Sequence, residues 1–414
     1  MSSAKSFNIS KQEVMAAWQC VKSNRGSAGI DRETIEAFES NLKGNLYKIW
    51  NRMSSGSYFP PPVLGVAIPK KLGGERILGI PTVSDRVAQV IVQRRLEVKL
   101  EPIFLPDSYG YRPGKSALDA IEVTKRRCWK QDWVLEFDIR GLFDNIRHDL
   151  LEKALAKHVT ESWVLLYVQR WLKAPMRFAD NSEKVRERGT PQGGCVSPIL
   201  SNLFLHYVFD SWMARTYPRL KWCRYADDGL IHCSSLKEAK QLKQELEKRL
   251  EACGLELHQG KTHIVYCADS NRTAQYDVTE FTFLGYTFRR RKSKTKMTNE
   301  LFDGFQPAIS KDAIKSIKRV IKGEWRLKSR AHLELKDIAK QINPIIRGWI
   351  NYYGRFYQAS LIPLTRYINE HLRLWAIQKH ESLRRHRVKS YDWLRKVYQT
   401  SPRLFAHWNV YRVY

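Results

Sequence analysis

The spacing of apolar and polar residues changes along the chain, and each kind of spacing predicts a different element. Apolar residues three and four positions apart predict amphipathic helices at residues 14–21, 85–98 and 236–252, and a further helix that begins within 109–121. Short runs bounded by turn residues predict strands: a hairpin with a basic tip at 63–81, a single strand at 133–139, and a strand-turn-strand at 221–233.

Residues 189–209 contain no Asp, Glu, Lys or Arg, which is long enough to raise the question of a membrane span. The stretch nevertheless includes two prolines and several polar side chains, among them Gln192, Asn202 and His206. A buried helix of a folded domain therefore explains this stretch better than a membrane helix.

The last third of the chain has a different character. After the basic run 289–296, we expect a Lys- and Arg-rich helical region without strands. Its aromatic residues Trp349, Tyr352, Tyr353 and Phe356 fall on one face of a helix. This periodicity favours a packed core, although Arg347 and Arg355 nearby would also suit a surface that faces RNA.

The net charge of the chain says more about its function than its length does. Its 414 residues carry a formal net charge of +29, from 71 Lys and Arg against 42 Asp and Glu. With 43% hydrophobic and 12% aromatic residues, the chain is a folded protein and not a basic tail. A polyanion is the expected partner, and nucleic acid fits better than an anionic membrane because no basic amphipathic anchor stands out.

The N-terminus and the cysteines indicate a protein of the cell interior. The first residues have no apolar segment typical of a secretory signal, so we expect a cytoplasmic location, in the bacterial cytosol or nucleoid. The seven cysteines form no C-x-x-C pair and are odd in number, as is typical of reduced thiols. We therefore expect neither a disulfide nor a zinc site.

The stretch RYADDGLI, residues 224–231, raises a question about chemistry because it places Asp227 beside Asp228. Adjacent carboxylates repel each other, so an exposed loop is the simplest interpretation. The alternative is a divalent cation, since Mg²⁺ prefers oxygen ligands. Two-metal phosphoryl transfer needs a further carboxylate from another strand, and Asp138 ends the predicted strand 133–139.

An ordered set of motifs then identifies a family resemblance. Asp138 with a downstream aromatic residue, TPQGG (190–194), YADD (225–228), GLELHQGKT (254–262) and FLGY (283–286) resemble a reverse transcriptase. NRGSAGID, IPKKLGGERILGIPT, YGYRPGKSALDAI and RGWINYYG are more specifically similar to the group II intron-encoded reverse transcriptase/maturase family, in its compact type without a nuclease. The resemblance runs from about residue 20 to the end of the chain and rests on the whole set.

The resemblance implies catalytic roles for particular residues. Asp138, Asp227 and Asp228 would be the catalytic carboxylates that bind two Mg²⁺ ions. Lys261 would lie near the pyrophosphate as a general acid, although an ordinary surface lysine competes with this interpretation. Two departures from the family pattern concern nucleotide preference: Leu142 stands where a second aromatic is expected, and His258 where an asparagine is expected.

The resemblance also implies residues that bind nucleotide and nucleic acid. Residues of the basic hairpin would clamp the incoming dNTP: Lys70, Lys71 and Arg76. Phe143 would be a steric gate against the ribose 2′-hydroxyl, while Gln192 and Gly193 would lie against the templating pair; a core phenylalanine and an ordinary turn are the alternatives. Residues expected to contact template or intron RNA are Arg112, Ser116, Arg347 and Arg355.

The expected architecture is an α+β right-hand polymerase, with fingers and an antiparallel palm sheet in residues 1–297. An all-helical thumb or maturase domain would follow in 298–375, and a short helical tail that contacts DNA in 376–414. The implied function is RNA-directed DNA synthesis from a primer, combined with intron RNA binding for splicing and for target-primed reverse transcription during retrohoming. A domesticated polymerase in host defence or repair, and a splicing factor that does not polymerise, remain as alternatives. The chain lacks paired Cys or His near its end, so we expect no endonuclease activity.

Overall fold

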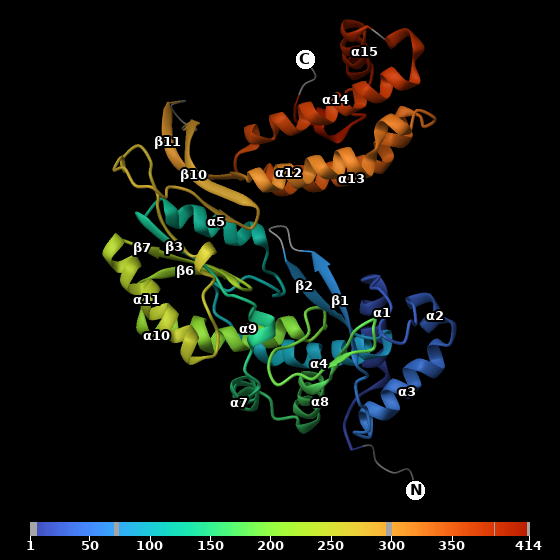
Figure 1. Cartoon of the computed structure of the whole chain (residues 1–414), viewed down its shortest axis with the longest axis vertical. Coiled ribbons are helices and arrows are strands. Elements are labelled where there is room, and N and C mark those ends of the chain that lie inside the picture. Colours follow the sequence, from blue (N-terminus) through green and yellow to red (C-terminus); the bar gives the residue numbers. More distant parts are fainter. Residues whose placement is uncertain (1–5, 70–73, 295–299, 385, 412–414) are drawn as a thin grey trace. The chain divides into compact units, whose positions relative to one another are not determined.

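The computed structural model describes residues 6–69, 74–294, 300–384 and 386–411. The chain divides into two compact units, one of Met1–Ala120 with Leu135–Thr262 and one of Ile121–Val134 with His263–Tyr414. Both units contain helices and strands (Figure 1), so the α+β class predicted from the sequence is confirmed. The finer division at residues 297 and 375 stays a prediction.

Helices make up about half of the first unit. They include α1 (Lys11–Ser23), α2 (Ile35–Ser40), α3 (Leu42–Ser54), α4 (Val83–Leu100), the start of α5 (Ala117–Cys128), α6 (Leu142–Asn145), α7 (His148–His158), α8 (Ser162–Lys173), α9 (Ser197–Leu205), α10 (Ser211–Thr216) and α11 (Leu236–Ala252). The helices predicted around residues 14–21, 85–98 and 236–252 are thus confirmed. α4 packs against α1, α3 and α8 and is buried around most of its surface.

A buried carboxylate joins two of these helices. Asp85 of α4 is 1% exposed and accepts hydrogen bonds of 2.7 Å from Tyr58 Oη and from Trp171 Nε1 of α8. Gln89, one turn later on α4, donates to Asp85 and accepts a hydrogen bond from the backbone N–H of Val196. This network ties the segment before α9 to the core of the first unit.

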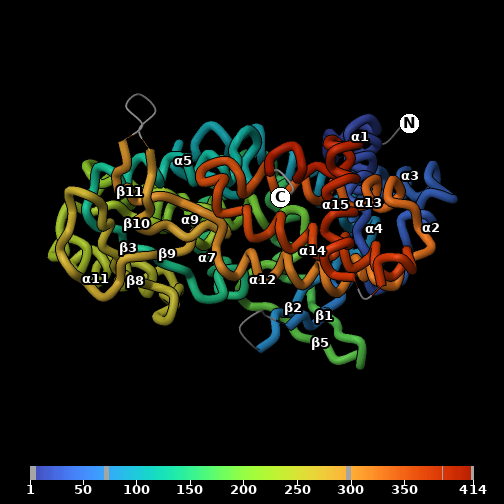
Figure 2. Tube along the Cα trace, turned by 90° about the horizontal axis from the view of Figure 1, so that it is seen from above, coloured from blue at the N-terminus to red at the C-terminus, as the bar shows by residue number. Residues whose placement is uncertain are grey.

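The predicted hairpin is confirmed as β1 (Val63–Pro69) and β2 (Glu75–Ile80), which pair antiparallel with Leu64 opposite Ile80 and Ile68 opposite Arg76. β1 also pairs with β4 (Met176–Arg177), which pairs with β5 (Glu183–Lys184). β1, β2 and β5 lie close together in Figure 2. Arg76 therefore lies on a small four-stranded sheet of β2, β1, β4 and β5.

A second sheet of the first unit bears the aspartates. β6 (Lys221–Tyr225) and β7 (Asp228–Cys233) form the predicted strand-turn-strand, and β3 (Trp133–Asp138) lies on the other side of β7. The inner positions of β3 and β7 are almost all buried, with apolar side chains above and below. The strands that carry Asp138 and Asp228 are therefore neighbours.

The uncharged stretch 189–209 contains α9 and a π-helical turn, His206–Asp210. Nearly every side chain from Ser197 to Asp210 is buried within the first unit, as the sequence predicted. Within the described ranges, no helix is both long and apolar enough to cross a membrane.

The second unit shows one wrong prediction. After β8 (His263–Tyr266), the strands β9 (Phe281–Phe283), β10 (Tyr286–Lys294) and β11 (Leu301–Ile309) form an antiparallel sheet with β10 in the centre. We expected no strand beyond residue 296, yet β11 pairs with β10 over nine residues from Leu301 to Ile309. Gly304 and Pro307 disfavour a strand by propensity, but β11 lies at the edge of this sheet, where proline is tolerated, and pairing with β10 overrides the propensity.

The rest of the second unit is helical, as expected. Its helices include the end of α5, α12 (Lys311–Val320), α13 (Leu335–Tyr353), α14 (Ile362–Lys379) and α15 (Arg387–Thr400). They enclose one apolar core that includes Ile321, Ile342, Leu372, Trp375 and Phe405.

The aromatic face of α13 belongs to this core. Trp349 stacks on Trp325 with ring centroids 5.5 Å apart. The centroid of Tyr286 on β10 lies 5.6 Å from those of both Tyr352 and Tyr353. The periodic aromatics therefore pack, as the sequence analysis favoured, and attach the sheet of the second unit to α13.

Candidate active site

A strained turn presents the two adjacent aspartates. Tyr225 and Asp228 are the last paired residues of β6 and β7, so Ala226 and Asp227 form the connection between the strands. Ala226 has φ +56°, a left-handed conformation that costs an alanine about 1–3 kcal/mol. Such a conformation persists only where the surroundings hold it in place.

A buried arginine supplies that support. Arg224 is 0% exposed, and its guanidinium donates to both carboxylate oxygens of Asp210 at 2.8 and 2.7 Å. The same group donates to Asn202 Oδ1, to Ser108 Oγ and to the carbonyl of Ala226, at 3.1, 2.7 and 3.1 Å. One fully satisfied cation thus fixes the backbone immediately before Asp227.

The sequence analysis missed this role for Arg224. An arginine inside the run KWCRY is a signal, because a strand position between Cys223 and Tyr225 is buried more often than exposed. Its partner Asp210 lies in the preceding π-helical turn, and no local pattern joins the two residues.

The third aspartate arrives on the neighbouring strand. Asp138 ends β3 and is 8% exposed, and Lys261 Nζ donates to its Oδ2 at 3.1 Å. The close packing of β3 on β7 requires a glycine, because a Cβ at Gly229 would lie 2.1 Å from the ring of Phe137. Three of the predicted catalytic residues and Lys261 therefore come together in the first unit.

The electrostatics of this cluster are those of crowded carboxylates. Burial, then the charge of Asp227, then a hydrogen bond with Asp138 raise the pKa of Asp228 to about 7. Burial is also the main cause that raises the pKa of Asp227, followed by Asp138, while Lys261 and Arg76 oppose the shift. Ionising Asp227 and Asp228 together is thus unfavourable without a further cation.

The donor set suits a hard divalent ion, since all the nearby candidates are carboxylate oxygens. Across the described part of the chain, however, no three His, Cys, Asp or Glu side chains are already arranged to hold a metal ion. The hydrogen bond between Asp138 and Asp228 and the Lys261 contact occupy oxygens that a metal would need. The metal-binding role of the aspartates therefore stays a prediction.

Of the predicted nucleotide clamp, the structure describes Arg76 alone, because Lys70 and Lys71 lie outside the described residues. Arg76 is exposed near the start of β2. It lies within electrostatic reach of Asp227, whose pKa it lowers. This placement is compatible with a role in binding phosphate, which stays a prediction.

The TPQGG loop is fastened to the hairpin and to the segment after β3. Gly79 N of β2 donates to Gln192 O at 2.8 Å, and a Cβ at Gly193, whose φ is +125°, would lie 2.5 Å from Gly79 O. Thr190 N donates to Phe143 O at 2.7 Å. Gln192, Gly193 and the half-buried Phe143 are thus grouped together, and their contacts with nucleotide stay predictions.

Arg112, predicted to contact the template, anchors its own loop. Its side chain is 6% exposed, its Nε and Nη2 donate to Glu101, and its Nη1 donates to the carbonyls of Leu105 and Ser108. These contacts occupy four of the five N–H donors of the guanidinium, and a contact with a template phosphate stays a prediction. Ser116 is exposed and forms a capping box with Asp119 at the start of α5, so a contact with template stays a prediction.

Arg347 and Arg355, expected at an RNA surface, belong to the second unit. Both are exposed, Arg347 on α13 and Arg355 just beyond its end. Both side chains are accessible to a ligand, and the RNA-binding prediction stays a prediction.

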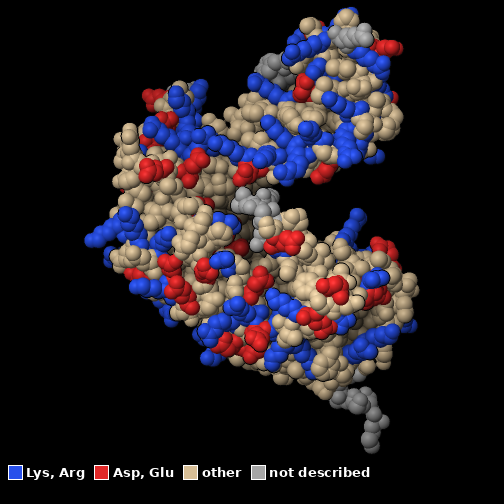
Figure 3. All heavy atoms as spheres, in the orientation of Figure 1, with Lys and Arg blue, Asp and Glu red and all other residues tan. Residues whose placement is uncertain are grey.

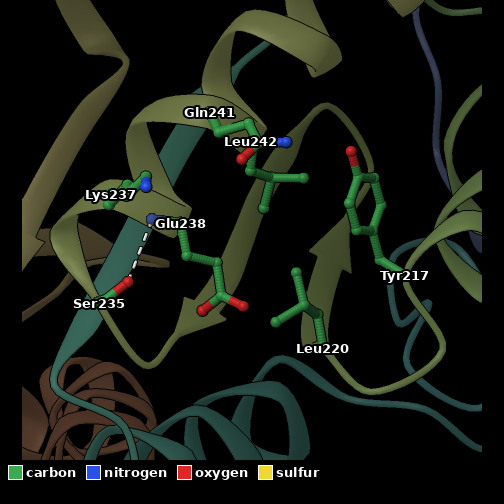
Figure 4. A pocket seen from close by; sticks show the side chains of 7 residues that line it. All are labelled: Tyr217, Leu220, Ser235, Lys237, Glu238, Gln241 and Leu242. Atoms are coloured by element: carbon green, nitrogen blue, oxygen red, sulfur yellow. Dashed lines mark hydrogen bonds between the residues drawn. The ribbon is translucent and has the colours of Figure 1, made fainter.

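A separate hollow of the first unit contains none of the predicted residues. It has a volume of about 300 Å³ and lies between the Tyr217–Leu220 connection and the first turns of α11 (Figure 4). Its wall combines Glu238 and Lys237 with Leu220 and Leu242. The carboxylate cluster, and not this hollow, gathers the candidate chemistry.

The match to known families agrees with this geometry. The family model "Reverse transcriptase (RNA-dependent DNA polymerase)" matches residues 68–288, which is more than half of the chain and includes all three aspartates. The chain belongs to the reverse transcriptase family. A second family model, "Group II intron, maturase-specific domain", matches residues 314–393 of this reverse transcriptase. The resemblance to group II intron-encoded reverse transcriptases is thereby confirmed.

Two relatives that are similar to this reverse transcriptase in sequence support the same family. Protein YkfC of Escherichia coli K12 is 29% identical over 308 residues, which cover 64% of this chain and 77% of YkfC. The group II intron-encoded protein LtrA of Lactococcus lactis subsp. cremoris is 29% identical over 349 residues. That match covers 67% of this chain and 55% of LtrA, so the chain spans about half the length of LtrA. Telomerase from Candida albicans, solved with a fragment of telomeric RNA, overlaps 91% of this chain and 67% of its own at 13% identity and a TM-score of 0.46.

Proposed function

We propose that this reverse transcriptase copies an RNA template into DNA from a primer 3′ end. The observation that carries the proposal is the convergence of Asp138, Asp227 and Asp228 on adjacent strands, with the pKa values of Asp227 and Asp228 raised by burial and by neighbouring carboxylates. A cluster of this kind gains from divalent cations, and family membership supports nucleotidyl transfer as its use.

Asp138, Asp227 and Asp228 would hold two Mg²⁺ ions. When bound, the ions would supply the positive charge that favours the primer 3′-alkoxide and the leaving pyrophosphate. Lys261, now on Asp138, would be released to face the pyrophosphate and donate a proton to it. Arg224 takes no part in the chemistry and would keep Asp227 in place.

The incoming dNTP would lie among residues that the first unit groups around the aspartates. Arg76 would bind the triphosphate through its guanidinium fork, and Gln192 with Gly193 would line the base pair being formed. Phe143 would exclude the ribose 2′-hydroxyl. Phe143 is followed in the chain by Asp144, whose carboxylate accepts a hydrogen bond from Gln192 Nε2 at 3.4 Å. Phe143 and Gln192, which are both expected to contact the nucleotide, are therefore close to each other.

We further propose that the second unit binds intron RNA to promote splicing, and that both units serve target-primed reverse transcription at a DNA site, in the bacterial cytosol or nucleoid. The maturase-specific match at 314–393 supports this role. Exposed basic residues recur on one side of α12 and the turn after it: Lys311, Lys315, Arg319 and Lys322. Lys and Arg gather over the α12 and α13 region in Figure 3, as a phosphate-binding surface requires.

The polymerase proposal is tested by primer extension with Mg²⁺ on an RNA template, with dNTPs and rNTPs in parallel. DNA product from the unaltered protein, lost in Asp227→Ala and retained in Asp149→Ala, is the expected result. Phe143→Ala should in addition accept rNTPs. The proposal is wrong if the pure protein binds primer–template and makes no product, or if Asp227→Ala extends primers at the original rate.

The RNA-binding proposal is tested by measuring affinity for intron RNA against salt concentration. Lys315→Glu with Arg319→Glu should weaken binding and lower the salt slope by about 2, near one unit per lost phosphate contact. A matched control changes the charge equally on exposed α11, through Lys240→Glu with Lys248→Glu. Equal losses in both double variants would mean that net charge alone, and not the α12 surface, binds the RNA.

A further inference from the structure

Tyr111 combines an exposed aromatic side chain with a left-handed backbone. Its side chain is 56% exposed, and its backbone has φ +57°. For a bulky residue the left-handed conformation is a genuine outlier, because the side chain crowds the backbone. An exposed tyrosine gains little packing to offset this strain, so its position is not explained by stability of the protein alone.

The residues before Tyr111 are fixed to the turn that carries Asp227. Tyr109 N donates to Arg224 O at 2.8 Å, and Asn202 Nδ2 donates to Gly110 O at 2.7 Å. A Cβ on Gly110 would lie 2.5 Å from Ala226 N, so the two backbones touch where a side chain is absent. Tyr111 therefore follows directly on a contact with the Ala226–Asp227 connection.

The residue after Tyr111 is anchored as firmly. Arg112 donates hydrogen bonds to Glu101 and to the carbonyls of Leu105 and Ser108, and these contacts hold the loop to the segment that precedes it. Because both neighbours are held, the strained backbone of Tyr111 cannot relax by a local shift. The loop presents the ring on a rigid support beside the carboxylates, as a preorganised binding residue requires.

The surroundings of the ring favour an uncharged role. Partial burial, then Asp227, then Tyr225 raise the pKa of Tyr111, and Arg76 opposes them. The phenol therefore stays protonated and uncharged at neutral pH. A neutral aromatic face in such a place suits a nucleobase better than a phosphate, which the carboxylates would repel.

We propose that Tyr111 is a stacking residue of the candidate active site, whose ring receives a nucleobase of the bound primer–template next to Asp227. The inference rests on the proposed function in that it takes the bound ligand to be nucleic acid. The base could belong to the primer 3′ end or to the template strand. Both offer the same aromatic face, so stacking is the shared chemistry that the structure supports.

The conformation of Tyr111 allows a sharp choice of variants. Tyr111→Gly removes the ring and suits φ +57°, so it relieves the strain and should not unfold the protein. Tyr111→Phe keeps the ring and the strain and removes only the hydroxyl. Tyr47→Ala is a matched control, since Tyr47 on α3 is 55% exposed and lies on a helix outside the carboxylate cluster.

The test measures equilibrium binding of an RNA template annealed to a DNA primer, without Mg²⁺ and without nucleotides. 2-Aminopurine is placed either at the primer 3′ end or at the template base opposite the first position to be copied, and its fluorescence reports stacking. We expect Tyr111→Gly to change the fluorescence at one of these positions and to weaken binding about tenfold to a hundredfold. Tyr111→Phe and Tyr47→Ala should match the unaltered protein, and the position that responds identifies the strand.

Two results would overturn the inference. Unchanged fluorescence and affinity in Tyr111→Gly at both positions would mean that no base stacks on the ring. Equal losses in Tyr111→Phe and Tyr111→Gly would mean that the hydroxyl, and not the aromatic face, binds the ligand. Because this measurement needs no catalysis, failure of primer extension would contradict the proposed function without deciding the role of Tyr111.

Discussion

Two arginine–aspartate forks of the first unit have nearly the same geometry in opposite surroundings. Arg224 Nε and Nη2 donate to Asp210 at 2.8 and 2.7 Å, and Arg147 Nε and Nη2 donate to Asp149 at 3.0 and 2.7 Å. The side chains of the first pair are both 0% exposed, whereas those of the second are 45% and 50% exposed. Geometry alone therefore does not tell which pair matters.

Burial makes the difference between the two forks. Water screens and replaces the exposed pair, and pairs of that kind contribute little to stability. The buried pair has no such replacement, and its arginine also binds Asn202, Ser108 and the Ala226 carbonyl. A charge pair under a catalytic turn thus fixes backbone, and its loss should affect both folding and function.

The largest effect is expected from a variant that changes the Asp227 carboxylate without changing the Arg224–Asp210 pair. Asp227→Ala removes a carboxylate that is proposed to bind metal and leaves the Arg224 fork intact, so folding and RNA affinity should barely change. Loss of several kcal/mol of transition-state stabilisation should slow primer extension by about a thousandfold or more. Single-turnover rates measure the loss of catalysis, and circular dichroism and RNA binding measure folding and RNA affinity. If the Asp227→Ala protein is unfolded or does not bind RNA, the Ala226–Asp227 turn is part of the structural core.

Asp210→Ala should have the next largest effect, because it leaves the buried Arg224 without its carboxylate. Breaking a buried pair on one side costs about 3–5 kcal/mol in the free energy of unfolding. Denaturant unfolding of the purified variant measures this loss. The Ala226 carbonyl should lose its restraint as well, so extension should slow even well below the unfolding transition.

Asp210→Asn serves as the milder companion, since it keeps the shape and one acceptor oxygen. It should lie between the unaltered protein and Asp210→Ala in stability and in rate. If either variant is as stable as the unaltered protein, the fork does not hold the turn and Ala226 must be kept in place by other contacts.

Local patterns were sufficient to predict the strands that carry the aspartates. Apolar runs that end in Asp138 and surround Tyr225–Asp228 identify β3, β6 and β7, and the leucine spacing of 236–252 gives α11. The confirmed aromatic core on α13 likewise follows from its period. These elements are determined mainly by residues close to one another in the sequence.

The rest depends on contacts that the sequence pattern does not contain. The role of Arg224 needs Asp210 and Ser108, which come from distant segments, and Arg112 is diverted from solvent by Glu101. β11 forms because β10 pairs with it, in spite of Gly304 and Pro307. The strained φ of Tyr111 has no signature in its own residue type and follows from anchors on both sides.

A smaller effect is expected from the crowded carboxylates as pH changes. The folded pKa of Asp228 is raised from an ordinary 3.8 to about 7, so its stabilising contribution is fully present below the unfolded pKa and is lost as pH rises through 7. Asp228→Asn carries no such charge. In EDTA, its free energy of unfolding should exceed that of the unaltered protein increasingly between pH 5 and pH 7, and the difference should level off above pH 7.

The control for this comparison is pH itself. At pH 4 the advantage of Asp228→Asn should nearly vanish, because Asp228 is then protonated in the folded protein and half protonated in the unfolded chain. Added Mg²⁺ at pH 8 should reduce the difference in free energy of unfolding, because it should stabilise the unaltered protein more than the variant. A difference independent of pH would show that Asp228 is not crowded by its neighbours.

The smallest expected effect completes the comparison of the two forks. Asp149→Ala removes the same bidentate partner as Asp210→Ala does, but Arg147 can then be solvated by water, so neither the unfolding midpoint nor the extension rate should change measurably. Any residual change should disappear at about 1 M salt, where the screening length falls to about 3 Å. A loss as large as that of Asp210→Ala would mean that the fork geometry, rather than burial, determines the strength of these pairs.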